Sequence, residues 1–233
     1  MNRVHVIQEL IDRKKAETYL EIGFGYGDAF LNIKAPRKLV VDPKFVILKK
    51  RVLKYFAKNI SKNIPNRYYR MTSDEFFETK KDLLRKTPPD IIFVDGLHTY
   101  EQSLKDVLNA LDIIKDNGVI VLHDCNPLSE AVAYPAGSYK EAKEANLPGW
   151  TGFWSGDVWK TAIYLRSQRP DLKAFVLNFD TGLGIIVKGR ENEPLRYSKE
   201  EMGKLSYKDL EQNREKLLNL KDAEYFRKFA KTL

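Results

Sequence analysis

A short apolar run, residues 18–22, leads directly into three glycines at alternate positions, Gly23, Gly25 and Gly27. Glycine lacks a Cβ atom, so the backbone there can turn tightly and approach a ligand closely. If a helix opens just after this turn, its N-terminal amides face the same spot. An α/β protein holds a nucleotide-like cofactor in this way at the carboxyl end of its first strand. The carboxylate of Glu21 would repel a diphosphate, whereas it would tolerate a sulfonium, an amine or a ribose.

Apolar runs alternate with helical patterns along most of the chain, which predicts parallel βαβ units. After the run at 18–22, four more buried strands are expected, at 39–41, 67–71, 90–94 and 119–122. Helices are expected at 4–15, at 44–60, from Ser73 onward, from Thr99 onward and at 158–166. Residues 172–179 and 183–188 flank Asp180-Thr181-Gly182 and predict a β-hairpin. These elements together predict a doubly wound α/β fold.

One cofactor-binding domain with an insertion and a helical tail is the expected organisation. The chain has 233 residues and 43% hydrophobic content, enough for one sizeable core. Residues 127–156 contain seven prolines and glycines, and all three tryptophans lie between 149 and 159. A loop this long is usually a lid or a binding loop. We expect a domain over residues 1–190 with a lid loop at 126–157, followed by a helical extension over 191–233.

Charge and cysteine content restrict the compartment and the partners. The formal net charge is +8, and residues 34–70 carry twelve Lys/Arg against the single acid Asp42. Such a basic segment could attract an acidic partner, although a lysine stripe is more often a solvated helix face. The single cysteine, Cys125, excludes an internal disulfide, and the sequence shows neither a signal peptide nor a bilayer-spanning run. We expect a cytoplasmic protein without a membrane partner.

A polar residue stands at the end of each expected parallel strand. These residues are Glu21, Asp42, Ser73 with Asp74, Asp95, and His123 with Asp124. Because the carboxyl ends of parallel strands share one edge of the sheet, we expect these side chains to meet in one crevice. A second histidine, His98, closely follows Asp95. An unperturbed imidazole titrates near neutrality, so His98 and His123 are the candidate catalytic bases.

The order of these features resembles the class I S-adenosylmethionine-dependent methyltransferases over about residues 18–190. Glu21-x-Gly23-x-Gly25-x-Gly27 matches their first motif, and the resemblance implies that these residues bind S-adenosylmethionine. It further implies that Asp42 grips the ribose hydroxyls, that Ser73 and Asp74 contact the adenine, and that Asp95 faces the cofactor. The implied fold is a Rossmann-like, mostly parallel seven-stranded sheet with an antiparallel last strand.

Residues 93–100 and 121–124 resemble more narrowly the small-molecule O-methyltransferases of the catechol and antibiotic- or sugar-tailoring kind. Many of those enzymes bind Mg²⁺, and the resemblance implies Asp95 and Asp124 as ligands, with a third from His123 or Asn126. Their fifth strand often ends in Asp-Asp, Glu-Asp or Asp-Asn, whereas this chain has His123-Asp124. Since Mg²⁺ prefers oxygen ligands, a softer divalent ion, or none, stays open as an alternative.

The expected reaction is transfer of a methyl group to a hydroxyl of a small molecule or saccharide. The protein must align the nucleophile with the sulfonium carbon and remove its proton. His98 or His123 would take that proton, or a metal at Asp95 and Asp124 would lower the pKa of the hydroxyl. The lid loop would close over the acceptor and exclude water.

Two other functions compete with this one. The basic segment favours an RNA methyltransferase or an RNA-binding protein on the same fold. Against it, the sequence shows no appended RNA-binding module, and Asn126-Pro127 is followed by Leu128 rather than by the Pro-Tyr of amino methyltransferases. A nicotinamide-dependent oxidoreductase is disfavoured by Glu21, and its third glycine would fall at Asp28. The charged terminal helices would form a solvated cap or a homo-oligomer contact.

Overall fold

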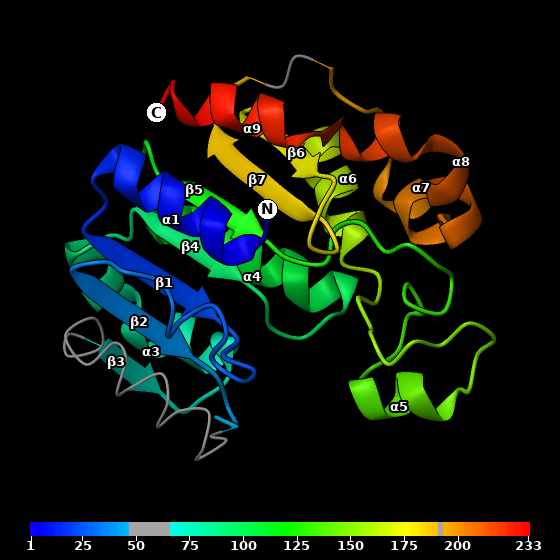
Figure 1. Ribbon diagram of the computed structural model, residues 1–233, viewed down its shortest axis with the longest axis horizontal. Helices are drawn as coiled ribbons and strands as arrows, with labels where there is room; N and C mark the ends of the chain where they lie inside the picture. The colour runs from blue at the N-terminus through cyan, green and yellow to red at the C-terminus, as the bar shows by residue number, and fades with distance from the viewer. Residues whose placement is uncertain (47–65, 191–192) are drawn as a thin grey trace.

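The computed structural model describes residues 1–46, 66–190 and 193–233. Its eight described strands form one sheet in the order β3-β2-β1-β4-β5-β7-β6-β8 (Figure 1). The strands are β1 (Thr18–Ile22), β2 (Arg37–Val41), β3 (Asn66–Tyr69), β4 (Ile91–Val94), β5 (Val119–Leu122), β6 (Leu172–Leu177), β7 (Leu183–Lys188) and β8 (Leu220–Lys221). The helices are α1 (Arg3–Lys14), α3 (Ser73–Lys86), α4 (Tyr100–Ile113), α5 (Tyr139–Glu144), α6 (Trp159–Gln168), α7 (Lys199–Lys204), α8 (Tyr207–Leu218) and α9 (Ala223–Ala230).

The sheet topology confirms the doubly wound α/β prediction. Strands β1 to β5 pair in parallel, and β7 is antiparallel to both β5 and β6. The chain runs outward from β1 to β3 and then returns to β4 on the other side of β1. Ligands of open α/β sheets bind at this kind of switch point, beyond the carboxyl ends of the strands. The described sheet has one strand more than the seven predicted, the two-residue β8, which pairs with β6.

Two hydrophobic clusters cover the two faces of the sheet because alternate residues of a strand point to opposite sides. In β4, Ile92 and Val94 face one cluster, whereas Ile91 and Phe93 face the other. Helices α3, α4, α6 and α8 contribute to the first cluster, and α1 and α9 to the second. The C-terminal residues therefore pack on both faces of the sheet. The division into a domain over 1–190 and an extension over 191–233 stays a prediction.

The structure changes some predicted helix ends. Thr72, rather than Ser73, caps α3, because its side chain accepts a hydrogen bond from the Glu75 amide. The helix predicted from Thr99 onward is α4, which Thr99 caps and which ends at Ile113. The helix predicted at 44–60 is absent from its described residues, 44–46, and residues 47–60 lie outside the described part of the chain.

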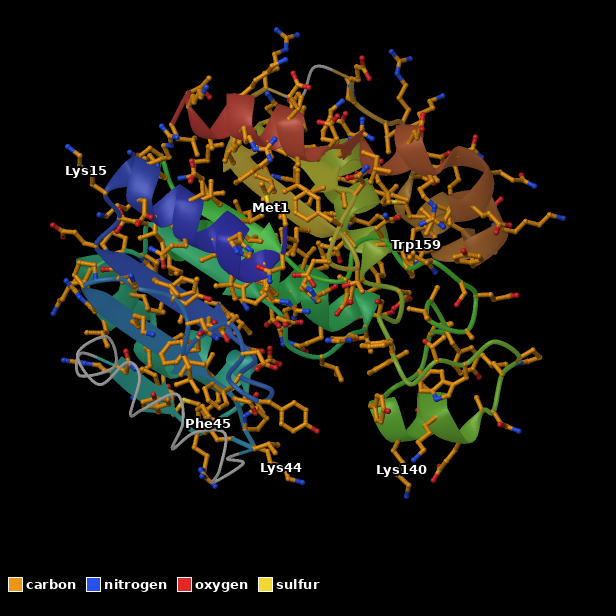
Figure 2. The ribbon with its side chains drawn as sticks, viewed as in Figure 1. Met1, Lys15, Lys44, Phe45, Lys140 and Trp159 are labelled. Atoms are coloured by element: carbon orange, nitrogen blue, oxygen red, sulfur yellow. The ribbon has the colours of Figure 1, made fainter. Side chains whose placement is uncertain are left out.

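The predicted lid loop extends away from the sheet and carries α5 (Figure 1). A small hydrophobic cluster of its own holds it together; the buried members are Ala136, Ala142 and Trp154. Lys140 projects from α5 away from the rest of the molecule (Figure 2). The helices of the described residues include none with the length and apolar character needed to cross a membrane.

Candidate active site

The glycine turn after β1 brings the first and fourth strand ends into contact. Gly23 has a φ of +89°, and a Cβ atom there would lie 2.0 Å from the carbonyl oxygen of Asp95. Gly27 has a φ of +77°, and its Cβ would lie 2.6 Å from the ring of Phe24. Gly25, in contrast, has open space around its Cβ position. Packing thus requires Gly23 and Gly27, whereas Gly25 leaves room for a ligand.

Replacing Gly23 with alanine should destabilise the fold by about 2–3 kcal/mol, because the backbones after β1 and β4 must separate. Urea denaturation followed by circular dichroism measures this loss. Gly149→Ala is the matched control, since Gly149 also has a positive φ, +78°, but no atom lies within 4 Å of its Cβ position. Equal stabilities of the two variants would contradict the role given to the close approach.

A cavity of about 850 Å³ opens at the carboxyl edge of the sheet. Nine of the eleven predicted site residues line it: Gly23, Gly25, Asp42, Ser73, Asp74, Asp95, His98, His123 and Asp124. Small-molecule sites commonly span roughly 300–1,000 Å³, so the volume suits a cofactor with a small acceptor.

Glu21 and Gly27 do not line the cavity. The Glu21 side chain is buried at 1% exposure and accepts a hydrogen bond from the hydroxyl of Tyr19. Burial raises the pKa of Glu21 to about 8, although the Tyr19 hydrogen bond opposes the shift. The structure therefore places this predicted cofactor ligand beneath the turn instead of in the crevice.

Asp42 occupies the end of β2, and its carboxylate is fixed by backbone amides. The Phe24 amide donates to Oδ2 and the Lys44 amide donates to Oδ1, each at 2.7 Å. One of these amides belongs to the glycine turn, so Asp42 ties that turn to the second strand. A carboxylate oxygen has two acceptor positions, which leaves each oxygen able to accept another hydrogen bond.

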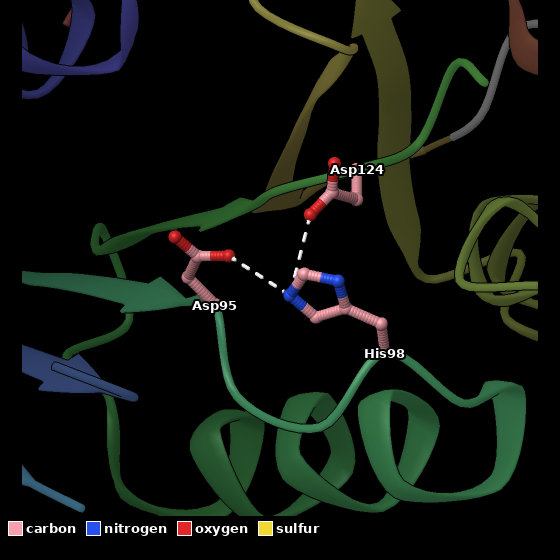
Figure 3. A group of neighbouring side chains, drawn as sticks. All are labelled: Asp95, His98 and Asp124. Carbon is pink, nitrogen blue, oxygen red and sulfur yellow. Dashed lines mark ion pairs between the residues drawn. The ribbon is translucent and has the colours of Figure 1, made fainter. Parts of the chain in front are cut away.

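An acid–histidine cluster forms where β4 and β5 end (Figure 3). His98 Nε2 lies 3.5 Å from Asp95 Oδ1 and 3.4 Å from Asp124 Oδ2. The other ring nitrogen, Nδ1, lies 2.7 Å from the carbonyl oxygen of Trp154. A carbonyl oxygen only accepts, so Nδ1 carries a proton and Nε2 faces the two carboxylates. Burial opposes charge on this ring, but attraction to Asp124 and Asp95 outweighs it and raises the pKa of His98 to about 9.

His123 lies deeper in the same cluster. Its Nδ1 is 2.8 Å from Asp124 Oδ2 and 3.3 Å from Asp95 Oδ1, and its Nε2 is 3.4 Å from Thr181 Oγ1. The His123 side chain is 4% exposed, whereas that of His98 is 25% exposed. Of the two predicted bases, His98 is therefore the more accessible to a substrate.

Three residues of the cluster had no site signal in the sequence. Arg3 donates to Asp95 Oδ2 at 2.9 Å and to Asp180 Oδ1 at 3.2 Å, and Ser155 donates to Asp124 Oδ1 at 2.7 Å. Asp180 belongs to a turn that predicted only a hairpin. The folded backbone does mark Asp180, because its φ value is positive, +53°, like that of Asp124, +60°. Non-glycine residues adopt positive φ values rarely, and those that do are often found at functional sites.

The donor set of Asp95, His98 and Asp124 fits a divalent metal ion. One ligand atom from each lies within 4.8 Å of the others. The third ligand predicted from the sequence was His123 or Asn126, but the structure groups His98 with the two acids, while Asn126 accepts a hydrogen bond from Arg214. Two carboxylates and one imidazole suit a borderline ion such as Mn²⁺ or Zn²⁺ better than Mg²⁺.

Comparisons with known proteins place these features in context. Residues 20–125 match the family model of a methyltransferase domain. No protein of curated function matches the sequence. An O-methyltransferase from Bacillus cereus, solved in complex with SAH, has a TM-score of 0.53 and 14% identity, with 81% of this chain and 82% of that chain covered.

Two further solved structures share the fold at the same level. The O-methyltransferase TomG from Streptomyces achromogenes, in complex with SAM, has a TM-score of 0.50 and 16% identity over 78% of each chain. The methyltransferase PaMTH1 from Podospora anserina, bound to SAH, has a TM-score of 0.50 and 17% identity, with 81% and 80% covered. At these identities the likeness concerns the fold alone.

Proposed function

We propose that this chain, a class I S-adenosylmethionine-dependent methyltransferase by its matched domain and its fold, methylates a hydroxyl group of a small molecule or saccharide. The observation that carries the proposal is the position of the acid–histidine cluster in the same cavity as the glycine turn. A methyl donor bound at the turn would thus lie within reach of groups that hold and deprotonate a hydroxyl.

The cofactor would extend along the crevice from the glycine turn to α3. The open position of Gly25 lets the ligand approach the backbone closely, and Asp42 has free acceptor positions for the two ribose hydroxyls. Thr72 and Ser73 line the far end, where a purine attached to that ribose would lie. Asp95 lies between the turn and the histidines, so its carboxylate would face the sulfonium end.

The chemistry is an in-line displacement at the methyl carbon. The hydroxyl oxygen forms a bond to that carbon, the carbon–sulfur bond breaks, and the sulfur leaves as a neutral thioether. With a pKa of about 9, the His98 ring carries a proton on both nitrogens in most molecules at neutral pH, so the base is the deprotonated fraction, which grows as the pH approaches 9. In that fraction His98 Nε2 takes the hydroxyl proton, and Asp95 and Asp124 stabilise the resulting imidazolium. The Trp154 carbonyl holds the ring in the tautomer that presents Nε2 to the reaction.

As the alternative to a histidine base, a divalent ion held by Asp95, His98 Nε2 and Asp124 would lower the pKa of the acceptor hydroxyl, and His98 would then be a ligand and not the proton acceptor. Arg3 and Ser155 orient the two carboxylates in either case, because each donates to one of them from outside the group. Assays with and without a chelator, followed by addition of Mn²⁺ or Mg²⁺, decide whether an ion is required.

The acceptor side of the crevice favours a small ring-containing molecule. Phe153 and Leu97 line the cavity with side chains that are 69% and 45% exposed, and Trp154 stacks on His98 with ring centroids 5.4 Å apart. Exposed apolar faces of this kind suit the flat side of an aromatic or sugar ring. The RNA alternative depends on the basic segment 34–70, most of which lies outside the described residues.

Methyl transfer from ³H-methyl S-adenosylmethionine tests the proposal. The acceptors are a panel of phenols, a panel of free sugars and total RNA. We expect the label in a small-molecule product that withstands mild alkali, because methyl ethers are stable to it and methyl esters are not. Label that appears only in RNA, or only in an alkali-labile product, would overturn the assignment to hydroxyl methylation.

A further inference from the structure

Gln102 lies in the first turn of α4 and lines the crevice beside Thr72 and Ser73. Thr99 and Gln102 have the spacing of a capping box, in which the Gln102 side chain would return to the Thr99 backbone, but it has other partners. Its amide nitrogen lies 3.2 Å from Ser73 Oγ, 3.1 Å from Asp74 Oδ1 and 3.1 Å from Asp106 Oδ1.

These partners determine which way the amide faces. Ionised carboxylates only accept hydrogen bonds, so the NH₂ group must face Asp74 and Asp106. In the opposite orientation the amide oxygen would face both carboxylates, and no hydrogen bond could form because all of these oxygens are acceptors. Hydrogen bonds from Lys105 and Gln102 keep the pKa of Asp74 below its ordinary value, while burial raises that of Asp106 to about 6, so both are mainly ionised at neutral pH.

The oxygen of Gln102 is consequently an acceptor that the protein leaves available. No residue in the described part of the chain donates a hydrogen bond to Oε1, and this atom is not among the buried polar atoms without a partner. Since Gln102 lines the crevice and its nitrogen is turned toward the acids, its oxygen is accessible to a ligand there.

We propose that Gln102 Oε1 accepts a hydrogen bond from the exocyclic 6-amino group of the cofactor's purine, and that Asp106 is the positioning residue that orients this amide. The inference rests on the proposed function, because it needs the purine at the α3–α4 end of the crevice. Asp106 is 1% exposed and acts only through Gln102 and its neighbours. A fixed acceptor selects an amino group and rejects a 6-oxo purine, whose oxygen would face Oε1.

Calorimetric titration with S-adenosylhomocysteine and S-inosylhomocysteine, which differ at position 6 of the purine, tests this assignment. We expect the wild-type protein to prefer the adenine ligand by at least about tenfold, the loss associated with one unpaired hydrogen-bonding group. Gln102→Met keeps the length of the side chain without the acceptor, and its preference should fall below about threefold. Gln102→Ala serves as a second variant should methionine disturb the packing.

Gln212→Met, at an exposed position on α8, is the matched control and should keep the wild-type preference. An unchanged preference in folded Gln102→Met and Gln102→Ala would overturn the inference and leave the proposed function intact. A wild-type protein that binds neither thioether would instead overturn the proposed function. The two failures are therefore distinguishable in one set of titrations.

Discussion

Replacing His98 with alanine should lower kcat about a thousandfold at saturating acceptor and donor near pH 9, where about half of the His98 rings are deprotonated, in the range usual for loss of a positioned general base. His98 Nε2 is the ring nitrogen that faces the crevice between Asp95 and Asp124, and no other histidine has comparable access. The dissociation constant of S-adenosylhomocysteine should change by less than about threefold, because the proposed cofactor site consists of the glycine turn and Asp42 and does not include His98. Initial rates and calorimetry measure the two quantities.

His5→Ala is the matched control, since His5 is an exposed histidine whose ring contacts Asn2. That variant should keep the wild-type kcat. A His98→Ala protein within tenfold of wild type would contradict the role given to His98. A proportional loss of kcat and of cofactor affinity would indicate a damaged crevice instead of a missing base.

The free energy of unfolding should fall as the pH rises from about 5 to about 8, and Glu21 is the largest cause below pH 6.5, while the raised pKa of His98 adds to the fall above it. In the folded protein Glu21 stays protonated up to about pH 8, whereas the unfolded chain ionises it near 4.5. The unfolded state thus binds fewer protons in this window, so folding loses stability as the pH increases. At pH 8 this one buried carboxyl lowers the free energy of unfolding by on the order of 4 kcal/mol relative to its value well below pH 4.5.

Glu21→Gln should make that fall smaller by the share of Glu21 and leave the share of His98, because its neutral amide keeps the hydrogen bond from Tyr19 without an ionisable group. Urea denaturation at pH 5 and at pH 8 measures the difference for each protein. Glu17→Gln, at an exposed position, is the matched control and should behave as wild type. Parallel curves for wild type and Glu21→Gln would show that Glu21 is not protonated in the fold.

Local patterns predicted the sheet and much of the crevice. Asp42 and Asp95 follow a strand directly and Asp124 follows one residue later, so the parallel arrangement alone brings them to one edge. Arg3 could not be predicted in this way, because it meets Asp180, 177 positions later in the chain, only after α1 packs on the sheet and the β6–β7 turn folds over it. Such contacts depend on tertiary packing and leave no periodic signal.

Other errors arose where two residues competed for one role. Thr72 and Ser73 are both of residue types that cap helices well, and in the structure Thr72, one position before Ser73, is the cap. Glu21 lies at a strand end like Asp42, but the alternation of β1 turns its side chain beneath the glycine turn, toward Tyr19. The spacing of Thr99 and Gln102 is that of a capping box, whereas Asp74 on α3 and Asp106 on the next turn of α4 provide stronger partners for the Gln102 amide.

Calorimetric titration of the wild-type protein with S-adenosylmethionine and S-adenosylhomocysteine tests the central claim most directly. The account predicts saturable binding of both with one site per chain. It also predicts at least about tenfold weaker binding by Asp42→Ala, which loses the acceptors for the ribose hydroxyls. Absence of both heat and a thermal shift with either ligand would contradict the assignment of this crevice to the methyl donor.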